Sequence, residues 1–548
     1  MTANALPASQ PARIQALEAA KLWSGQTLHG LLRHQCRQRP DQLAVADPNN
    51  RGELLGDASS PQRLSFSQLD HAAWQLAQQL RQAGVSAGDV VAVQLPNIVE
   101  LALCYFALSQ IGAVISPLPV QYRGHEIATL CSVTQLRLAI TCRQFKSEPL
   151  AANWRQAEPA LKLLVWGEQL MLADLLDHLS PEHTAVVDQP NAIVTLCWTS
   201  GTTGTPKAVP RSHNMWVASA QATITAGQYQ PGDRLLNPFP LVNMAAIASF
   251  LYPMVLTGCS LILHHPLDVP LFLQQLVSEK IHYTVAPPPL LNQLAKNPEL
   301  WQQLDTSALR AIGSGSAPLS AWMLEQFEKN YGVPIVNLYG SNEGVTLFAT
   351  RDNCPNPTLR ATQFPLPAEG SGMRCAVVDV DSRQQLTGNG ACGELMFAGP
   401  TVFDGYANSA ADDSFTTLDG IAYFCTGDLV ELCDNARQIR IVGRCKELIN
   451  RGGEKISPIE LDQLLEQMPA VAEVACFGYA DARLGERVGA AVVVAAEQPT
   501  PSLQELCDFL EQRGVAKTKW PEQLQIVEHL PRNPLGKIER FNLTTKIA

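Results

Sequence analysis

The stretch Thr199-Ser200-Gly201-Thr202-Thr203-Gly204-Thr205-Pro206-Lys207 is rich in groups that bind an anion. It contains five hydroxyl side chains, two glycines and one lysine, and it follows an apolar, β-branched run at residues 192–198 that predicts a buried strand. Glycine lets the backbone approach an anion closely, while amide N–H groups, hydroxyls and a lysine supply donors and positive charge. This composition predicts a loop that holds the phosphates of a nucleotide. The alternative is an ordinary solvated loop between a strand and a helix, and the spacing is not that of a Walker-A loop.

The overall composition is that of a globular protein with more than one domain. The chain has 548 residues, 46% of them hydrophobic and 17% charged, which exceeds the length that one core accommodates. A net charge of −11 without a basic run argues against nucleic acid as a partner. Residues 1–13 lack the apolar core of a signal peptide and no stretch is long enough to span a membrane, so a cytoplasmic location is expected. The 14 cysteines lack metal-ligand spacing, which argues against a zinc site.

Helix-length segments alternate with short apolar strands over much of the chain, which predicts a parallel sheet with crossover helices. Strands are expected at residues 90–95, 113–116, 138–141, 163–166, 259–264, 283–286, 311–313 and 335–338. Short β-rich pieces at 370–445 predict a small barrel or sheet. The expected fold class is α/β: a large N-terminal domain at 1–443 with parallel-rich sheets and a small β-barrel-like subdomain, and then a small, mobile α+β C-terminal domain at 444–548.

Further short motifs place small or polar residues at expected strand ends and turns. They are Gly315-Ser316-Ala317-Pro318, Tyr339-Gly340-Ser341-Asn342-Glu343, Thr426-Gly427-Asp428, Gly443-Arg444-Cys445-Lys446, Asn450-Arg451-Gly452-Gly453-Glu454-Lys455 and Pro531-Arg532-Asn533-Pro534-Leu535-Gly536-Lys537. Open α/β sheets bind ligands at the carboxyl ends of their strands. A glutamate there can hold Mg²⁺, and an aspartate that closes a strand can accept from ribose hydroxyls. Taken singly, each motif also fits an ordinary turn.

In their order and spacing, the motifs of residues 30–545 resemble those of the adenylate-forming superfamily of acyl-CoA synthetases, aryl-acid ligases, luciferases and carrier-protein adenylation domains. The stretch 199–207 is similar to the family's phosphate loop, 339–343 to its Tyr-Gly-x-Thr-Glu motif and 426–428 to its ribose-binding motif. Residues 443–446 are similar to its hinge and 531–537 to its catalytic-lysine loop. The resemblance implies a two-step enzyme reaction. A carboxylate attacks ATP to give acyl-AMP and pyrophosphate, the small domain rotates, and a thiol then takes the acyl group.

The resemblance also implies a role for each matched residue. Nucleotide binding falls to Thr199, Ser200, Gly201, Thr202, Thr203, Gly204, Lys207, Gly315, Ser316, Ala317, Tyr339, Gly340, Asp428 and Arg444. Lys537 would bridge the carboxylate and the α-phosphate, Glu343 would bind Mg²⁺, and Asn342 stands where the family usually has a threonine that touches the α-phosphate. Lys446 would be the hinge pivot, and Gly452 and Gly453 would line the thiol tunnel. The implied cofactors are ATP, Mg²⁺ and CoA, or the phosphopantetheine of a carrier protein.

The acid pocket is expected at Asn243, Met244, Ala245 and Ser249, with Gly313 and Val345 close by. Its small apolar side chains, and the lack of a lysine or arginine for a second carboxylate, predict a monocarboxylic, mainly apolar acid. Residues 514–522 resemble short- to medium-chain or alicyclic acyl-CoA synthetases, which act in fatty acid metabolism. Residues 210–214 and 450–456 instead resemble dihydroxybenzoate- or salicylate-type ligases that load a carrier protein.

The first hypothesis is therefore an acyl-CoA synthetase that uses CoA as the acceptor. An aryl-acid ligase is the alternative, with Asn243 bonding a ring hydroxyl. A non-catalytic nucleotide-binding protein on the same fold is a third hypothesis, because Asn342 replaces the usual threonine. No fused carrier domain is expected, and a second copy of the chain is a further possible partner.

Overall fold

The described part of the chain divides into two compact units. The computed structural model describes residues 6–177, 188–199, 206–316, 318–408, 414–452, 454–532 and 538–544. One unit comprises Met1–Ala361, Pro367–Arg374 and Ala398–Ala422, and the other comprises Thr362–Leu366, Cys375–Phe397 and Tyr423–Ala548. The second unit thus draws on two short earlier segments as well as on the C-terminal part, and the domain boundary at 443/444 stays a prediction.

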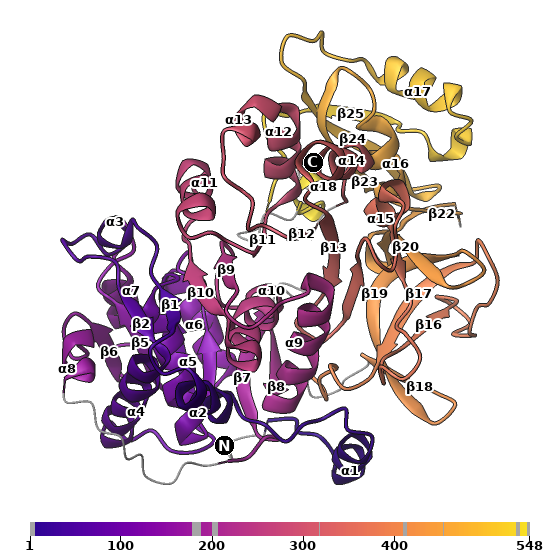
Figure 1. The fold of residues 1–548 in the computed structure, drawn as a ribbon. Coiled ribbons are helices and arrows are strands. Elements are labelled where there is room, and N and C mark those ends of the chain that lie inside the picture. The colour runs from indigo at the N-terminus through magenta and orange to yellow at the C-terminus, as the bar shows by residue number, and fades with distance from the viewer. Residues whose placement is uncertain are drawn as a thin grey trace. The chain divides into compact units, whose positions relative to one another are not determined.

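The first unit contains a six-stranded sheet in the order β6-β5-β3-β4-β7-β8 (Figure 1). Its strands are β3 (Val90–Gln94), β4 (Val114–Pro117), β5 (Leu136–Cys142), β6 (Leu163–Trp166), β7 (Ile193–Thr199) and β8 (Lys207–Ser212). All neighbouring strands are parallel except β7 and β8, which are antiparallel. Every residue of β3 is buried, as expected for a strand that is covered on both faces.

An eight-stranded sheet of the same unit has the order β14-β13-β12-β11-β9-β10-β1-β2. Its strands are β1 (Leu43–Ala46), β2 (Arg63–Ser65), β9 (Arg234–Asn237), β10 (Ser260–Leu263), β11 (Tyr283–Val285), β12 (Ala311–Gly315), β13 (Ile335–Gly340) and β14 (Thr346–Ala349). The inner strands are parallel, and the edge strands β2 and β14 are antiparallel to their neighbours. These pairings confirm the parallel-rich α/β class.

Helices connect and cover the strands of both sheets. They are α1 (Pro11–Ala19), α2 (Leu28–Gln38), α3 (Arg51–Leu55), α4 (Phe66–Gln82), α5 (Val99–Ile111), α6 (Gly124–Val133), α7 (Leu150–Ala157), α8 (Leu172–Leu176), α9 (His213–Gly227), α10 (Met244–Ala246), the π-helical turns η1 (Ile247–Leu251) and η2 (Met254–Gly258), α11 (Val269–Ser278), α12 (Pro288–Lys296), α13 (Pro298–Gln302), α14 (Ala321–Tyr331) and α15 (Pro357–Thr362). Helix α4 begins where the Gln68 amide donates to the Ser65 hydroxyl. Helix α5 ends at Gly112, whose φ of 79° suits glycine.

Alternate strand residues contribute to cores on opposite faces of each sheet. Val91 of β3 lies in a large central core, whereas its neighbour Ala92 lies in a second core with residues of α6 and α7. In the eight-stranded sheet, Val45 of β1 lies in the central core and Ala46 lies in a third core with residues of α11 to α14. The central core also contains residues of α4, α5 and α9, so these helices pack between the two sheets.

The second unit contains an antiparallel sheet and a C-terminal α+β region. The first sheet has the order β15-β20-β19-β17-β16, where a barrel or sheet is expected. Its strands are β15 (Gln363–Pro365), β16 (Arg374–Val378), β17 (Cys392–Ala398), β19 (Ile421–Cys433) and β20 (Gln438–Arg444), and β18 (Phe415–Leu418) precedes β19. The C-terminal elements are η3 (Cys445–Glu447), β21 (Ile449–Arg451), β22 (Glu454–Ile456), α16 (Pro458–Leu465), β23 (Val471–Asp481), β24 (Gly485–Val494), α17 (Leu503–Gln512), η4 (Lys517–Lys519), β25 (Gln523–Ile526) and α18 (Phe541–Thr544).

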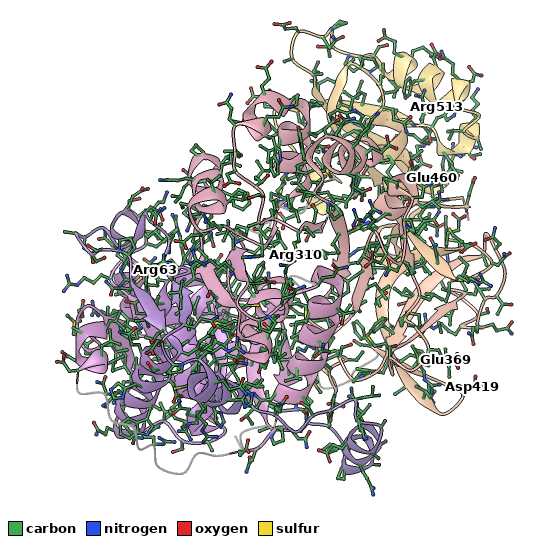
Figure 2. All side chains as sticks on the ribbon, in the orientation of Figure 1. Arg63, Arg310, Glu369, Asp419, Glu460 and Arg513 are labelled. Atoms are coloured by element: carbon green, nitrogen blue, oxygen red, sulfur yellow. The ribbon has the colours of Figure 1, made fainter. Side chains whose placement is uncertain are left out.

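Ion pairs lie near several strands of the first unit, and two of their arginines, Arg63 and Arg310, are labelled in Figure 2. Arg63 and Arg234 both contact Glu279, with N–O distances of 2.6 and 3.0 Å, just after α11 ends. Arg310 pairs with Asp233 before β9. The carboxylates of these pairs are largely buried, whereas the arginines are partly exposed.

Candidate active site

The predicted acid-pocket residues begin a buried helical segment of the first unit. Asn243 precedes α10, and its Oδ1 accepts a hydrogen bond from the Ala246 amide at 3.4 Å. Met244 and Ser249 are buried, whereas Asn243 and Ala245 are half-buried. The partly accessible amide of Asn243 thus lies at the beginning of this apolar segment.

Gly313 lies opposite a buried tyrosine that the sequence analysis missed. A Cβ atom on Gly313 would lie 2.3 Å from the Tyr283 hydroxyl oxygen, so only glycine fits beside this tyrosine. The Tyr283 ring is fully buried and packs against the rings of Tyr229 and Phe250, with centroid distances of 4.8 and 6.5 Å. Val345, the remaining predicted pocket residue, is also buried. Aromatic side chains therefore fill the space beside Gly313.

Asn342 connects two of the predicted site segments through its side-chain amide. Its Oδ1 accepts from the Met244 amide at 2.8 Å, and its Nδ2 donates to the Trp198 carbonyl at 3.3 Å. Trp198 lies in β7, next to the start of the candidate phosphate loop, and Met244 begins α10. The side chain thus joins the acid-pocket segment to the base of that loop, a contact that its position in the motif does not reveal.

Glu343 is a buried carboxylate and not a solvated side chain in a loop. The side chain is 8% exposed, and the Tyr406 hydroxyl donates to its Oε1 at 2.8 Å. The next residue, Gly344, has a φ of 110°, and a Cβ atom there would lie 2.0 Å from the Thr401 carbonyl oxygen. Glycine therefore lets the turn after Glu343 approach residues 401–406 closely.

The candidate phosphate loop connects two antiparallel strands. Thr199 at the end of β7 pairs with Lys207 at the start of β8, so the loop joins two strands rather than a strand and a helix. Asn408 supports the base of the loop, because its Oδ1 accepts from the Ala208 amide at 3.0 Å and its Nδ2 donates to the Pro206 carbonyl at 2.8 Å. Helix α9 begins only after β8.

Two further predicted segments lie at the ends of the neighbouring parallel strands β12 and β13. Gly315 ends β12, and a Cβ atom there would lie 2.2 Å from the Leu338 carbonyl oxygen of β13. Ser316 follows with a φ of 68°. Tyr339 and Gly340 form the end of β13. Strand pairing thus brings Gly315 close to the Tyr339–Gly340 segment, as the rule for carboxyl ends of parallel strands predicts.

Arg211 is a fully buried cation whose guanidinium lies beside Met244 and Asn342 of the predicted site. Its guanidinium donates to the Ser219 hydroxyl and the Thr401 carbonyl, both at 2.7 Å, and to the Met215 carbonyl at 3.1 Å. The guanidinium also lies 4.1 Å from the centre of the Trp216 ring. Burial lowers the pKa of Arg211 to about 10. The side chain therefore connects β8, α9 and the segment after β17.

The predicted ribose residues form an ion pair within the second unit. Asp428 of β19 and Arg444 of β20 are cross-strand partners, with 3.0 Å between Oδ1 and Nε. The expectation that the strand ends at Asp428 is wrong, since β19 continues to Cys433. Lys446 lies in the 3-10 turn η3, and Gly452, with a φ of 62°, lies between β21 and β22.

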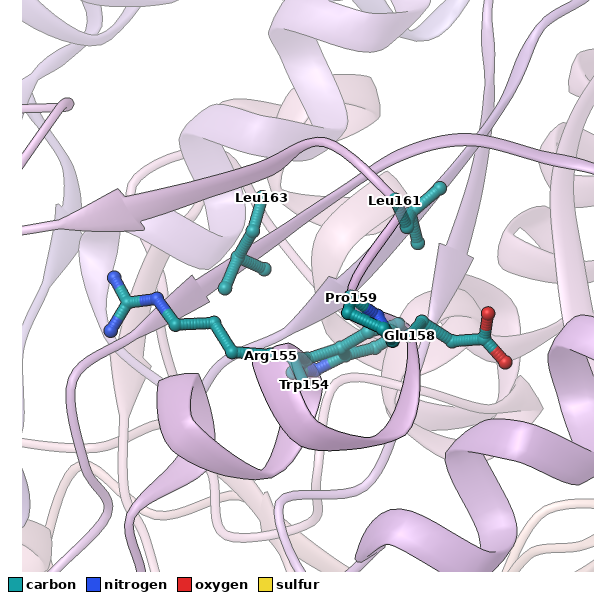
Figure 3. Close-up of a pocket in the computed structure, with 6 residues that line it drawn as sticks. All are labelled: Trp154, Arg155, Glu158, Pro159, Leu161 and Leu163. Carbon is teal, nitrogen blue, oxygen red and sulfur yellow. The ribbon is translucent and has the colours of Figure 1, made fainter.

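Several predicted residues lie outside the described part of the chain: Ser200, Gly201, Thr202, Thr203, Gly204, Ala317, Gly453 and Lys537. A surface pocket between α7 and β6 is unrelated to the predicted site. It is lined by Trp154, Arg155, Glu158, Pro159, Leu161 and Leu163, none of which is a predicted site residue (Figure 3).

The residues present suit magnesium better than a transition metal. Within the described residues, no group of three or more His, Cys, Asp or Glu side chains is arranged to hold a metal ion. Mg²⁺ commonly uses only one or two protein carboxylates, together with water and phosphate oxygens of a bound nucleotide. The buried carboxylate of Glu343, held on one oxygen by Tyr406, is a fitting ligand of that kind.

Sheets of mostly parallel strands, a hydroxyl- and glycine-rich sequence after β7 and the buried carboxylate of Glu343 are features of a nucleotide-using α/β enzyme. The model of the AMP-binding enzyme family matches residues 32–407, and that of the AMP-binding enzyme C-terminal domain matches residues 460–537. The chain belongs to this adenylate-forming family, whose members are AMP-forming acid ligases.

Relatives with different acids and acceptors resemble the chain to a similar degree. It is 30% identical to the medium-chain fatty-acid–CoA ligase of Escherichia coli, over 96% of this chain and 91% of the relative. It is 29% identical to the salicyl-AMP ligase of Mycobacterium tuberculosis, over 98% and 93%. ATP-bound MatB from Rhodopseudomonas palustris has the same fold, with a TM-score of 0.80 and 24% identity over 95% of this chain and 99% of that one. Within the described residues, no helix has the length and apolarity needed to cross a membrane.

Proposed function

We propose that this protein activates a monocarboxylic acid with ATP to an acyl-AMP and then transfers the acyl group to the thiol of CoA. The observation that carries this proposal is the contact between Asn342 and Met244. It joins the acid-pocket segment to the turn that carries the Glu343 carboxylate. An acid held beside α10 would therefore adjoin the groups proposed to bind the nucleotide.

In the first step, a carboxylate oxygen of the acid forms a bond to the α-phosphorus of ATP. The bond from that phosphorus to pyrophosphate breaks, and pyrophosphate leaves. Lys537 and the loop at 199–207 offset the negative charge that builds between the two anions. Mg²⁺, when bound, screens the phosphate oxygens, and Glu343 holds it. The adenosine part is held by Gly315, Ser316, Ala317, Tyr339, Gly340, Asp428 and Arg444.

In the second step, the thiol sulfur forms a bond to the acyl carbonyl carbon. The bond from that carbon to the AMP oxygen breaks, AMP leaves, and the thiol proton passes to solvent. We assign Gly452 and Gly453 to the path of the thiol and Lys446 to the hinge between the domains 1–443 and 444–548. Glycines suit a narrow path because they have no side chain to obstruct it.

The surroundings of the pocket favour a short, mainly apolar acid. Ala245 and Ala246 of α10 are small side chains close to Asn243, and Tyr283 fills the space beside Gly313. An apolar acid gains about 0.8 kcal/mol for each CH₂ group that it buries. An acid that extends past Gly313 would have to displace a tyrosine ring.

An aryl-acid ligase that loads a carrier protein is the second candidate. It is favoured by the half-buried amide of Asn243, which can bond a ring hydroxyl, and by the similarity to the salicyl-AMP ligase. A small apolar pocket also accommodates a planar ring. The two candidates differ in both the acid and the acceptor, so one experiment separates them.

The deciding experiment incubates the protein with ATP, Mg²⁺, CoA and a pool of aliphatic, alicyclic and aromatic acids, followed by mass spectrometry of the products. Acyl-CoA from an aliphatic or alicyclic acid is the expected result. Aryl-AMP without thioester would support the carrier-protein alternative. Binding of ATP without any release of pyrophosphate would show a non-catalytic protein and overturn the proposal.

A further inference from the structure

Tyr406 contacts charged residues from two separate predicted motifs of the first unit. It lies in the segment after β17 and is 7% exposed. Its ring packs edge-on against Phe403, with 4.8 Å between the ring centres. Packing against Phe403 and burial hold the ring in place. The sequence analysis gave this tyrosine no role.

The hydroxyl of Tyr406 holds the proposed metal-binding carboxylate. It donates to Glu343 Oε1 at 2.8 Å, and both side chains are buried. The Phe403 amide also donates to the Glu343 carbonyl, at 2.9 Å, so the backbone of the same segment is attached to the same turn. A hydrogen bond to one carboxylate oxygen limits the rotation of the group. Such a bond to a charged acceptor is stronger than one between neutral groups.

The ring of Tyr406 holds the lysine that ends the candidate phosphate loop. The Lys207 ammonium lies 4.2 Å from the ring centre, which is the geometry of a cation–π contact. The same tyrosine therefore contacts Lys207 with its ring and Glu343 with its hydroxyl. An ammonium and a carboxylate attract each other strongly in a partly buried site. Because Lys207 lies over the ring and Glu343 accepts from the hydroxyl, Tyr406 holds the two charged groups at separate positions.

We propose that Tyr406 is a positioning residue that prepares both charged groups for a magnesium-bound nucleotide. Its hydroxyl fixes one oxygen of the Glu343 carboxylate, which would hold Mg²⁺, and its ring fixes the Lys207 ammonium at the start of β8. The inference rests on the proposed use of ATP, but it is independent of which acid and which thiol react. It predicts that the two parts of the side chain affect nucleotide binding differently.

The test compares Tyr406→Phe, which keeps the ring, with Tyr406→Leu, which removes ring and hydroxyl. Calorimetric titration measures the Kd of ATP with Mg²⁺ and with EDTA, and pyrophosphate release is followed in parallel. The matched control is Tyr331→Phe, because Tyr331 donates to the Leu294 carbonyl at 3.0 Å between α14 and α12. Thermal unfolding of each variant reports whether the fold is retained.

Tyr406→Phe should weaken binding of Mg-ATP about tenfold and leave binding of metal-free ATP within about twofold of the unaltered protein. Tyr406→Leu should also weaken metal-free ATP, by about fivefold, because Lys207 loses its contact. The control Tyr331→Phe should change neither the Kd of Mg-ATP nor that of metal-free ATP.

If Tyr406→Phe weakened ATP binding equally with and without Mg²⁺, the tyrosine would have a structural role only, and the inference would be overturned. Unchanged binding of Mg-ATP in this variant would do the same. If the unaltered protein bound no ATP, the proposed function itself would fail. That result is distinguishable because it does not involve a variant.

Discussion

At the residue scale, the contacts of the Asn342 side chain change the interpretation of the Tyr339–Glu343 motif. The adenylate-forming family usually has a threonine at this place, and an amide there raised the possibility of a non-catalytic protein. In the structure the amide makes two backbone hydrogen bonds, to Met244 and Trp198. The asparagine side chain thus joins the segments that contain Met244 and Trp198.

We expect Asn342→Ala to raise the KM for the acid about tenfold. The Met244 amide would lose its acceptor, and an unsatisfied buried group costs about 1–3 kcal/mol. Pyrophosphate release at varied acid and varied ATP measures the effect on each substrate. Asn337→Ala is the matched control, because the Asn337 amide also bonds two backbone carbonyls, those of Arg360 and Ala361. A control variant with the same rise in KM would show that the effect of Asn342 is merely structural.

Lys537→Ala should reduce acyl-AMP formation by at least about a hundredfold. A fixed cation that stabilises developing charge typically contributes this much to the rate. Exchange of labelled pyrophosphate into ATP measures the first step alone, so transfer to the thiol does not obscure the result. Exchange at the rate of the unaltered protein would remove Lys537 from the proposed mechanism.

At the scale of the elements, we propose that the ends of β11 and β12 limit the length of the acid pocket. Both strands belong to the parallel part of the eight-stranded sheet, and their pairing places Tyr283 opposite Ala311. The tyrosine side chain reaches along the strand to Gly313, two residues further on. The missing side chain of Gly313 on one strand makes room for the Tyr283 hydroxyl on the next. The space beside Gly313 can therefore be judged only when both residues are known.

Tyr283→Val should shift the preferred acid toward longer chains. Valine suits a strand and removes the ring that fills the space beside Gly313. Mass spectrometry of the products from an equimolar mixture of straight-chain acids of graded length measures the shift. Tyr283→Phe keeps the ring and should retain the original length preference. An unchanged product profile in the valine variant would mean that the pocket does not end at this tyrosine.

At the scale of the whole molecule, three buried histidines make the first unit sensitive to acid. Burial is the main cause that lowers the pKa of His29 and of His265 to about 4 and that of His213 to about 3. The Leu28 amide donates to Nδ1 of His213, and the Asn97 amide donates to Nδ1 of His265. A nitrogen that accepts from an amide carries no proton, so protonation would break these bonds.

The contribution of these three histidines to stability should therefore be nearly constant well above pH 6.5 and fall as the pH decreases toward about 4. Unfolded histidine binds a proton near pH 6.5, so the unfolded state holds more protons than the folded state in this window. Each histidine with a folded pKa of about 4 lowers the free energy of unfolding by about 3 kcal/mol near pH 4. Urea unfolding at several pH values and constant ionic strength measures the slope.

His265→Gln should flatten this dependence, whereas His529→Gln should not, because the His529 side chain is 86% exposed. Equal slopes in the two variants would show that buried histidines are not the cause. The comparison needs no substrate and no assay of activity. It tests the interior of the first unit independently of the proposed function.

Much of the architecture could be predicted because it depends on short-range patterns. Apolar strands such as β3 and β6 are visible as runs of valine and leucine, and their alternation with helices predicts a parallel sheet. Strand β8 was missed, because its Lys207–Ser212 segment contains a proline, a lysine and an arginine. Asp428 was taken as a strand end because the Thr-Gly-Asp sequence resembles a turn.

The sequence by itself determined the α/β class, the order of the motifs and the membership in the adenylate-forming family. The class follows from periodicity and composition, which act between residues close in the chain. The membership follows from the resemblance of short motifs and from the match to the family model. Only the tertiary structure decided that Asn342 contacts Met244, that Tyr283 faces Gly313, and that Tyr406 contacts both Glu343 and Lys207. Such pairs come from distant segments and form where close packing brings them together, and no local pattern records which side chains meet there.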